Sequence, residues 1–189
     1  MGRTDKASRV IEAPLKSVYA ALIDPEALAE WLPPEGMTGH FEHFEPRAGG
    51  SYRMTLTYVD PSSSGGKSSA DSDVVEGHFV ELILDDRVVQ AAEFHSSDPS
   101  FAGTMIITWS VTEADTGTRV DVIADDVPPG ISADDHVSGM NSSLSNLAGY
   151  LGRQGSPHSS QVPRVSGAVG LSVGRSRTSR LGPSPRHTG

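Results

Sequence analysis

The sequence predicts an α+β domain in which an antiparallel sheet of about seven strands is combined with one long C-terminal helix. Three observations support this class. The middle of the chain alternates apolar and polar residues, short apolar segments near the N-terminus repeat with a helical period, and residues 132–151 form a long amphipathic stripe. Because the strands follow one another through short connections, we expect hairpins and antiparallel pairing.

The N-terminal part is expected to contain one strand and two short helices. Residues 7–12 are typical of a short strand, and apolar residues at steps of three and four predict a helix over 15–23. A second short helix is predicted to begin at Asp24 and to end before Pro33. Aspartate is a favoured N-cap, and Pro25 is tolerated at the first helical position.

The remaining strands are predicted in the middle of the chain. The clearest alternation places Tyr52, Met54, Leu56 and Tyr58 on one strand face. Further strands are expected over 37–45, 74–83, 87–94, 105–111 and 119–122, with tight turns at Asp85-Asp86 and Asp115-Thr116-Gly117 and a flexible loop over 61–72.

The last helix has the strongest pattern. Ser132 is its expected N-cap, and Asp135 follows three residues later, as in a capping box. About twenty residues would give a helix of roughly 30 Å, which is long enough to cross a sheet. Its apolar stripe consists of Val137, Met140, Leu144, Leu147 and Leu151.

Composition divides the chain after residue 151. Residues 1–151 hold all 24 acidic residues and nine of the 15 basic ones, a net charge of −15. Residues 152–189 hold the other six bases and no acid, with eight Ser, seven Gly, four Pro and no Phe, Trp or Tyr. We therefore expect a domain at 1–151 and a disordered tail at 152–189. The tail could contact nucleic acid or an acidic partner, or it could be a segment that natural selection does not maintain for any function.

Composition also excludes several classes of function. The chain has no cysteine, so disulfide frameworks, thiolate metal sites and cysteine nucleophiles are excluded. It has no apolar run of the length a membrane span requires, and its polar first residues do not resemble a signal peptide, so a cytoplasmic location is expected. A net charge of −15 opposes binding of residues 1–151 to nucleic acid or to anionic membranes.

Titratable side chains form no convincing metal or catalytic pattern. His40 and His43 are three residues apart on a predicted strand, where alternation would send them to opposite faces. His78, His95 and His136 have no partner at the spacing of metal ligands. Paired aspartates fall at predicted turns, strand ends or the first turn of a helix. We therefore expect no metal, no cofactor and no catalytic residue.

Several motifs in a fixed order resemble a known family. They are Ile11-Glu12-Ala13-Pro14, Val18-Tyr19-Ala20-Ala21-Leu22, Asp24-Pro25-Glu26-Ala27-Leu28 with Trp31, Pro46-Arg47-Ala48-Gly49-Gly50-Ser51-Tyr52, Gly77 with Phe79 and Glu81, and Gly117-Thr118-Arg119. Over residues 4–151 the chain resembles the START-like helix-grip superfamily (SRPBCC), in the branch of activators of the heat-shock-protein-90 ATPase. The resemblance implies a curved sheet wrapped around the C-terminal helix. Related sequences commonly have Gly-Trp where this chain has Gly139-Met140, which implies a larger or more plastic cavity.

The large apolar residues of the sheet and helices are the candidate ligand-binding set. The same residues could instead form an ordinary hydrophobic core. The family resemblance makes a ligand-binding cavity as plausible as a filled core. Tyr52 and Tyr58 share a strand face and could direct their hydroxyls at a ligand. The set consists of Trp31, Phe41, Tyr52, Met54, Tyr58, Phe79, Trp109, Met140 and Leu144.

We therefore expect a non-enzymatic domain that binds a small hydrophobic molecule between the sheet and the C-terminal helix. The resemblance implies two alternatives. One is a co-chaperone-like protein, related to stress response, whose partner is a chaperone ATPase. The other is an enzyme similar to polyketide cyclases or hydrolases.

Overall fold

The computed structural model describes residues 2–60 and 71–155 of the chain. Most of the expected loop 61–72 and most of the expected tail 152–189 lie outside these residues. The elements are β1 (Arg3–Ile11), α1 (Leu15–Ile23), α2 (Pro25–Trp31), β2 (Met37–Phe44), β3 (Ser51–Tyr58), β4 (Ser72–Ile83), β5 (Arg87–Phe94), the 3₁₀ turn η1 (Pro99–Phe101), β6 (Met105–Ala114), β7 (Gly117–Val127) and α3 (Ala133–Gly155).

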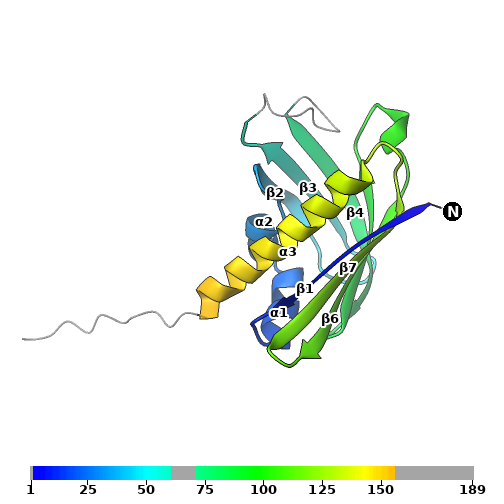
Figure 1. Cartoon of the computed structure of the whole chain (residues 1–189). Coiled ribbons are helices and arrows are strands. Elements are labelled where there is room, and N and C mark those ends of the chain that lie inside the picture. Colours follow the sequence, from blue (N-terminus) through cyan, green and yellow to red (C-terminus); the bar gives the residue numbers. More distant parts are fainter. Residues whose placement is uncertain (1, 61–70, 156–189) are drawn as a thin grey trace, which may run out of the picture. The chain divides into compact units, whose positions relative to one another are not determined.

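The seven strands form one curved antiparallel sheet, and α3 lies across its hollow side (Figure 1). The strand order is β1-β7-β6-β5-β4-β3-β2, so successive strands from β2 to β7 are neighbours and β1 pairs with β7. The predicted α+β helix-grip class is confirmed. Several boundaries differ from expectation. β1 begins at Arg3 rather than at residue 7, β4 begins at Ser72, β6 and β7 are longer than predicted, and α3 continues to Gly155.

The predicted helix starts are confirmed by their capping geometry. The Asp24 carboxylate accepts a hydrogen bond from the Glu26 amide at 2.9 Å, with Pro25 at the first helical position. The Ser132 hydroxyl accepts one from the Asp135 amide at 3.4 Å. These caps satisfy amide groups that have no partner inside a helix, so they fix where α2 and α3 begin.

One prediction about β2 is wrong. The pairing of β2 with β3 shifts between Phe41 and His43, so Glu42 is an extra residue in the strand. His40 pairs with Thr55 and His43 pairs with Arg53, two positions on the same face of β3. The bulge therefore brings both histidines to the outer face of the sheet instead of to opposite faces.

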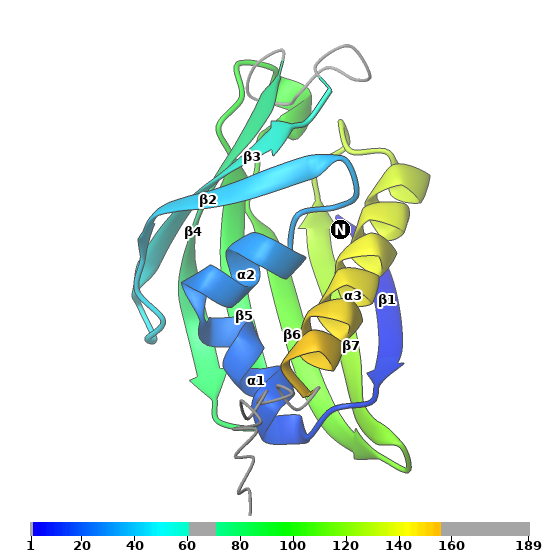
Figure 2. The same ribbon diagram turned by 90° about the vertical axis from the view of Figure 1, so that its left-hand side faces the viewer.

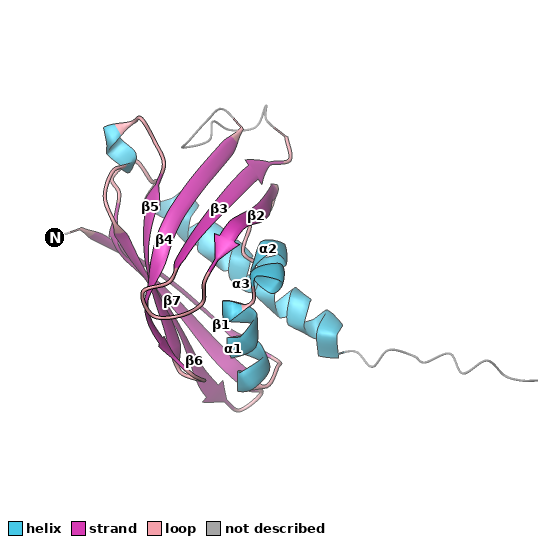
Figure 3. Ribbon diagram, turned by 180° about the vertical axis from the view of Figure 1, so that it is seen from behind, coloured by secondary structure: helices cyan, strands magenta, loops and turns pink. Residues whose placement is uncertain are grey.

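The helices cover the inner face of the sheet, by which we mean the face that carries the core. α3 packs against β1, α1 and α2. Figure 3 shows from behind that the three helices lie on one side of the sheet. In Figure 2, α1 and α2 cover the lower part of β5 and α3 lies over β6 and β7, whereas none of these helices stands in front of the upper parts of β4 and β5.

Polar side chains of α3 fix its position beside the end of α2. The Ser143 hydroxyl donates to the Leu32 carbonyl at 2.5 Å, and the Asn146 amide donates to the Pro33 carbonyl at 2.8 Å. The Ser142 hydroxyl accepts a hydrogen bond from the Glu35 amide at 2.9 Å. These bonds satisfy backbone groups at the end of α2 and hold α3 in one register.

Within residues 2–60 and 71–155, no helix is both long enough and apolar enough to cross a membrane.

Candidate functional site

The lower part of the inner face is closed by helices. Val88 of β5, Trp109 of β6 and Val122 of β7 pair across the sheet in one row. Trp31 of α2 packs its ring edge-to-face on Trp109, with ring centres 5.4 Å apart, and donates from its indole to the Ala21 carbonyl at 3.0 Å. Trp31 is only 1% exposed. We call these four residues, Trp31, Val88, Trp109 and Val122, the sealed region.

The upper part of the inner face is less covered. Val75 of β4 pairs with Phe94 of β5, and Leu56 lies on the same side of β3. Ile107 of β6 lies two rows further down. All four side chains are only half-buried, although they face the same side as the core. We call Leu56, Val75, Phe94 and Ile107 the half-buried region.

Two small residues lie in the row between Phe94 and Ile107. Tyr52, Gly77, Ala92 and Met105 pair across four strands there. A Cβ added to Gly77 would lie 2.6 Å from the Tyr52 hydroxyl oxygen, so the phenol ring occupies the space above this glycine. The absence of a side chain at residue 77 therefore lets the Tyr52 hydroxyl extend along the inner face toward β5.

The Tyr52 side chain is buried, and its hydroxyl has no hydrogen-bond partner among the described residues, but the hydroxyl oxygen is not cut off from solvent. Tyr52 is 6% exposed, and its ring is surrounded by Phe41, Phe44 and Phe79, with the Phe79 ring centre 5.5 Å away. Burial raises the pKa of Tyr52 above its ordinary value of 10, so the phenol stays protonated. A neutral phenol can donate one hydrogen bond and accept others.

The nine residues predicted as a ligand-binding set separate by their burial. Trp31, Phe79 and Leu144 lie fully inside the core, so they would reach a ligand only if their neighbours moved. Tyr52, Met54, Trp109 and Met140 are buried but slightly exposed, while Phe41 and Tyr58 are half-buried on β2 and β3. The structure therefore brings Tyr52, Met54 and Phe41 close to the half-buried region.

Three residues in or beside the half-buried region were not identified as site residues from the sequence. They are Val75, Ile107 and Gln90. Val75 and Ile107 fit the strand alternation, but alternation cannot tell a half-buried position from a closed one. Gln90 lies on the inner face of β5, paired with Phe79 and Ile107, and is half-buried with no hydrogen bond among the described residues. A polar residue within an otherwise apolar strand face was the signal that could have identified it.

A buried ion cluster joins β1 to the first turns of α3. His136 Nδ1 lies 2.7 Å from the Asp5 carboxylate, and the Arg3 guanidinium donates two hydrogen bonds to the two oxygens of the same group at 2.9 and 3.0 Å. Asp5 is 5% exposed. Burial acts to raise the pKa of Asp5, but the hydrogen bonds from Arg3 and His136 outweigh it and lower the pKa. This carboxylate is therefore charged and fully occupied.

The outer face carries a separate, exposed ion network. Arg53 pairs with Glu42 and Glu76, and Glu76 also lies 3.2 Å from His95. These hydrogen bonds lower the pKa of Glu76 and raise that of Arg53. Among the described residues, no group of three or more acidic or histidine side chains is arranged to hold a metal ion.

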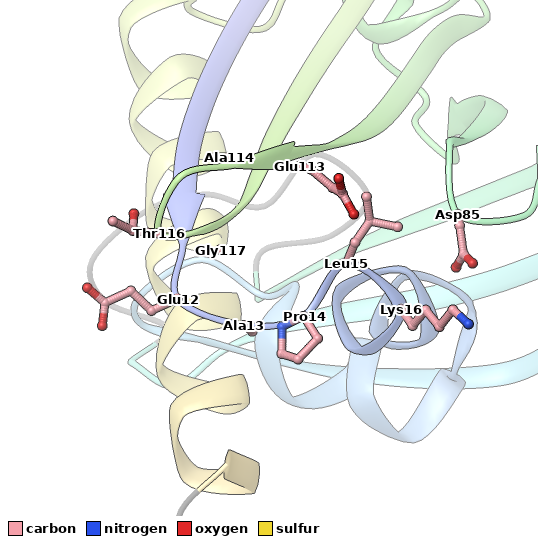
Figure 4. Close-up of a pocket in the computed structure, with 10 residues that line it drawn as sticks. All are labelled: Glu12, Ala13, Pro14, Leu15, Lys16, Asp85, Glu113, Ala114, Thr116 and Gly117. Atoms are coloured by element: carbon pink, nitrogen blue, oxygen red, sulfur yellow. The ribbon is translucent and has the colours of Figure 1, made fainter.

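Two surface hollows lie away from the half-buried region. The larger, of about 910 Å³, lies at the lower end of the sheet, where β1, α1 and two hairpin turns meet (Figure 4). Its charged side chains are Glu12, Lys16, Asp85 and Glu113, which come from four different segments. The smaller, of about 300 Å³, lies between α3 and the α2–β2 connection and includes Glu30, Asn146 and Arg153.

Comparison with solved structures supports the fold. A protein from Chromobacterium violaceum is 29% identical, with a TM-score of 0.69 over 78% of this chain and 96% of that one. A Rhodobacter sphaeroides protein is 19% identical, with a TM-score of 0.65 over 81% and 95% of the two chains. DynU16, a protein of the dynemicin biosynthetic locus, is 21% identical, with a TM-score of 0.57 over 80% of this chain and 48% of its own.

None of the curated proteins matches this chain. A family model does match it, over residues 12–152, which include every element from α1 to α3 except the last residues of the helix. That model describes the Activator of Hsp90 ATPase homolog 1-like proteins. With the fold and the matched length agreeing, the chain belongs to the Activator of Hsp90 ATPase homolog 1-like family.

Proposed function

We propose that this domain binds a small hydrophobic molecule on the inner face of the sheet, at the half-buried region beside α3. The observation that carries the proposal is the partial exposure of Leu56, Val75 and Ile107, which face the core side but are only half-buried. Apolar surface in contact with water costs free energy, and a ligand that covers it recovers about 25 cal/mol per Å². Sites of this kind are apolar with a few placed polar groups.

Two uncharged polar side chains near the half-buried region could form hydrogen bonds to a ligand. Tyr52 offers a hydroxyl that has no hydrogen-bond partner among the described residues and keeps contact with solvent, and Gln90 offers an uncharged amide on β5. Neither side chain belongs to the ion networks of the molecule. They could orient a ligand without a charged contact, which supports binding rather than catalysis.

A thermal-shift screen tests the proposal. Purified protein is heated with a panel of lipids, sterols and aromatic polyketides, and a ligand present at a hundred times its Kd should raise the Tm by several degrees, equivalent to about 2.7 kcal/mol. The variant Val75→Phe fills the half-buried region and should abolish the shift while keeping the fold. Val59→Phe, at a position 68% exposed, is the matched control and should respond like the wild type. A folded protein that no compound stabilises would contradict the proposal.

A second candidate function is a contact with a chaperone ATPase, which the family description names. It is favoured by the larger hollow, where Glu12, Asp85 and Glu113 outnumber Lys16. A basic surface of a partner would be attracted there, and salt would weaken the attraction.

The test of the second candidate is the ATPase rate of purified Hsp90 with and without the protein, at low and at high salt. Stimulation that falls with salt and is lost in Glu113→Lys would support it. Glu45→Lys makes the same charge change at an exposed turn outside the hollow and should keep the stimulation. An unchanged ATPase rate at both salt concentrations would contradict this candidate.

A further inference from the structure

The outer face of the sheet, opposite the core, carries apolar side chains in its central strands. In an antiparallel sheet with one solvated face, the outward residues are normally polar. Val89 of β5 and Ile123 of β7 lie on this face, because their strand neighbours Val88 and Val122 point into the core, and both are only half-buried. Figure 3 shows α1, α2 and α3 together on the other side, so within residues 2–60 and 71–155 no helix covers this face.

More exposed apolar side chains border the same surface. Ile83 and Leu84, at the end of β4 and in the turn that follows, are 37% and 75% exposed. Val10 of β1 is 47% exposed and pairs with Arg119 on the outer side of β7. Clusters of exposed apolar residues on a protein surface commonly mark interaction sites. The outer face is therefore a candidate docking surface.

One row of this face has opposite charges at its two ends. Across β1, β7, β6, β5 and β4 the paired residues are Lys6, Ile123, Thr108, Val89 and Glu81. Thr108 is the middle residue, with an apolar side chain on each side and a charged one beyond it. Neighbouring strands lie about 4.8 Å apart, so Lys6 and Glu81 are both about 10 Å from the middle strand.

The next row repeats this arrangement of charge. Across the same five strands its paired residues are Ser8, Asp121, Ser110, Arg87 and Ile83. Asp121 and Arg87 lie one strand to either side of Ser110 and have opposite charges. Their side chains, 31% and 40% exposed, pair within the chain with Arg119 and with Glu81 and Asp86, but remain accessible from the outer side.

We propose that a second copy of this chain packs on the outer face, with a two-fold axis that runs along β6 over Thr108 and Ser110. Such an axis places each residue against the residue that lies equally far on the other side of β6 in the other copy. Lys6 of one copy then faces Glu81 of the other, and Ile123 faces Val89. Asp121 likewise faces Arg87. The inference does not depend on the proposed ligand site, which lies on the inner face.

The shape of the sheet limits the strength of this association. Because α3 lies on the hollow side of the sheet, the outer face is convex, and two convex faces meet over a limited width (Figure 1). A small interface gives weak association, so we expect a dimer Kd of about 1 to 100 µM. Each copy has a net charge of −9, and salt at about 0.15 M screens the long-range repulsion between copies.

Sedimentation velocity of the full chain tests the proposal at concentrations from about 2 to about 200 µM. Val89→Lys should abolish the dimer, because it puts a charge into the apolar contact with Ile123 of the other copy. Its neighbour Glu81 can pair with the new lysine, so the monomer should stay folded, as circular dichroism would verify. Val59→Lys, at a position 68% exposed at the end of β3, is the matched control and should keep the dimer.

A charge exchange tests the orientation of the two copies. Lys6→Glu should raise the dimer Kd about 10-fold, because two symmetric contacts become repulsive at once. Adding Glu81→Lys reverses both charges of the contact and should recover most of the affinity. Lys16→Glu makes the first charge change on α1 and should leave the Kd unchanged. A chain that is monomeric at about 200 µM, a dimer that survives Val89→Lys, or a double variant that recovers no affinity would each overturn the inference.

Discussion

The sealed and half-buried regions lie on the same face of one sheet, yet they differ in what covers them. Below, Trp31 of α2 sits on Trp109 and closes the surface. Above, Val75 and Ile107 point to the same side but are only half-buried. Both regions have the alternation typical of a half-buried sheet, so the difference arises from helix placement. The comparison shows that a closed core and a partly exposed surface can share one strand pattern.

The largest expected effect comes from opening the sealed region. Trp31→Ala removes the indole that fills the space over Trp109 and its hydrogen bond to the Ala21 carbonyl. We expect a loss of about 3–5 kcal/mol in the free energy of unfolding, as for other aromatic side chains deleted from cores. Urea denaturation followed by circular dichroism measures it. A loss below 1 kcal/mol would mean that α2 does not seal this region.

A matched pair of valines tests the comparison directly. Val88→Ala, in the sealed region, should cost about 2–3 kcal/mol, because it leaves a void that the surroundings cannot fill. Val75→Ala, in the half-buried region, should cost about 1 kcal/mol or less, since water already reaches its side chain. The same denaturation experiment compares both. Equal losses would show that the two regions are energetically one core.

The ion cluster of Asp5 should make stability depend on pH. The folded pKa of Asp5 is lowered from 3.8, so its contribution is complete above pH 3.8 and is lost as the pH falls through the folded pKa. His136→Gln removes one of the two hydrogen-bond partners of the Asp5 carboxylate and should cost about 1–2 kcal/mol at neutral pH. The difference from the wild type should shrink under acid, as urea titrations between pH 2 and pH 7 would measure. His95→Gln, on the exposed outer network, is the control and should change stability little.

The smallest effect is expected at Tyr52. Because the hydroxyl has no partner among the described residues and keeps contact with solvent, Tyr52→Phe should change the free energy of unfolding by less than about 1 kcal/mol. Thermal unfolding by calorimetry without ligand measures this. A loss above 1 kcal/mol would indicate that the hydroxyl is satisfied within the protein.

The sequence alone predicted the helices and strands and their order along the chain. The alternation from Tyr52 to Tyr58, the Asp24 and Ser132 caps and the α3 stripe are local signals, and each corresponds to an observed element. The bulge at Glu42 was missed, although Phe41 and Phe44 carried a signal. Both pack against the core, and a spacing of three is incompatible with regular alternation.

The candidate site was less accessible to sequence reasoning. The exposure of Val75 and Ile107 depends on where α2 and α3 stop covering the sheet, and this is a long-range property. The link between Asp5 and His136 joins residues 131 positions apart. The place of Tyr52 above Gly77 depends on strand register, which hydrophobic periodicity alone does not specify.

The bulge in β2 also has a consequence for self-association. β2 is an edge strand of the sheet, and its outer row of backbone groups is where a second molecule could add a strand. The extra residue at Glu42 interrupts the regular spacing of that row, and the charged side chain makes close approach less favourable. This edge is therefore a poor template for intermolecular strand pairing, which protects the folded domain from aggregation through β2.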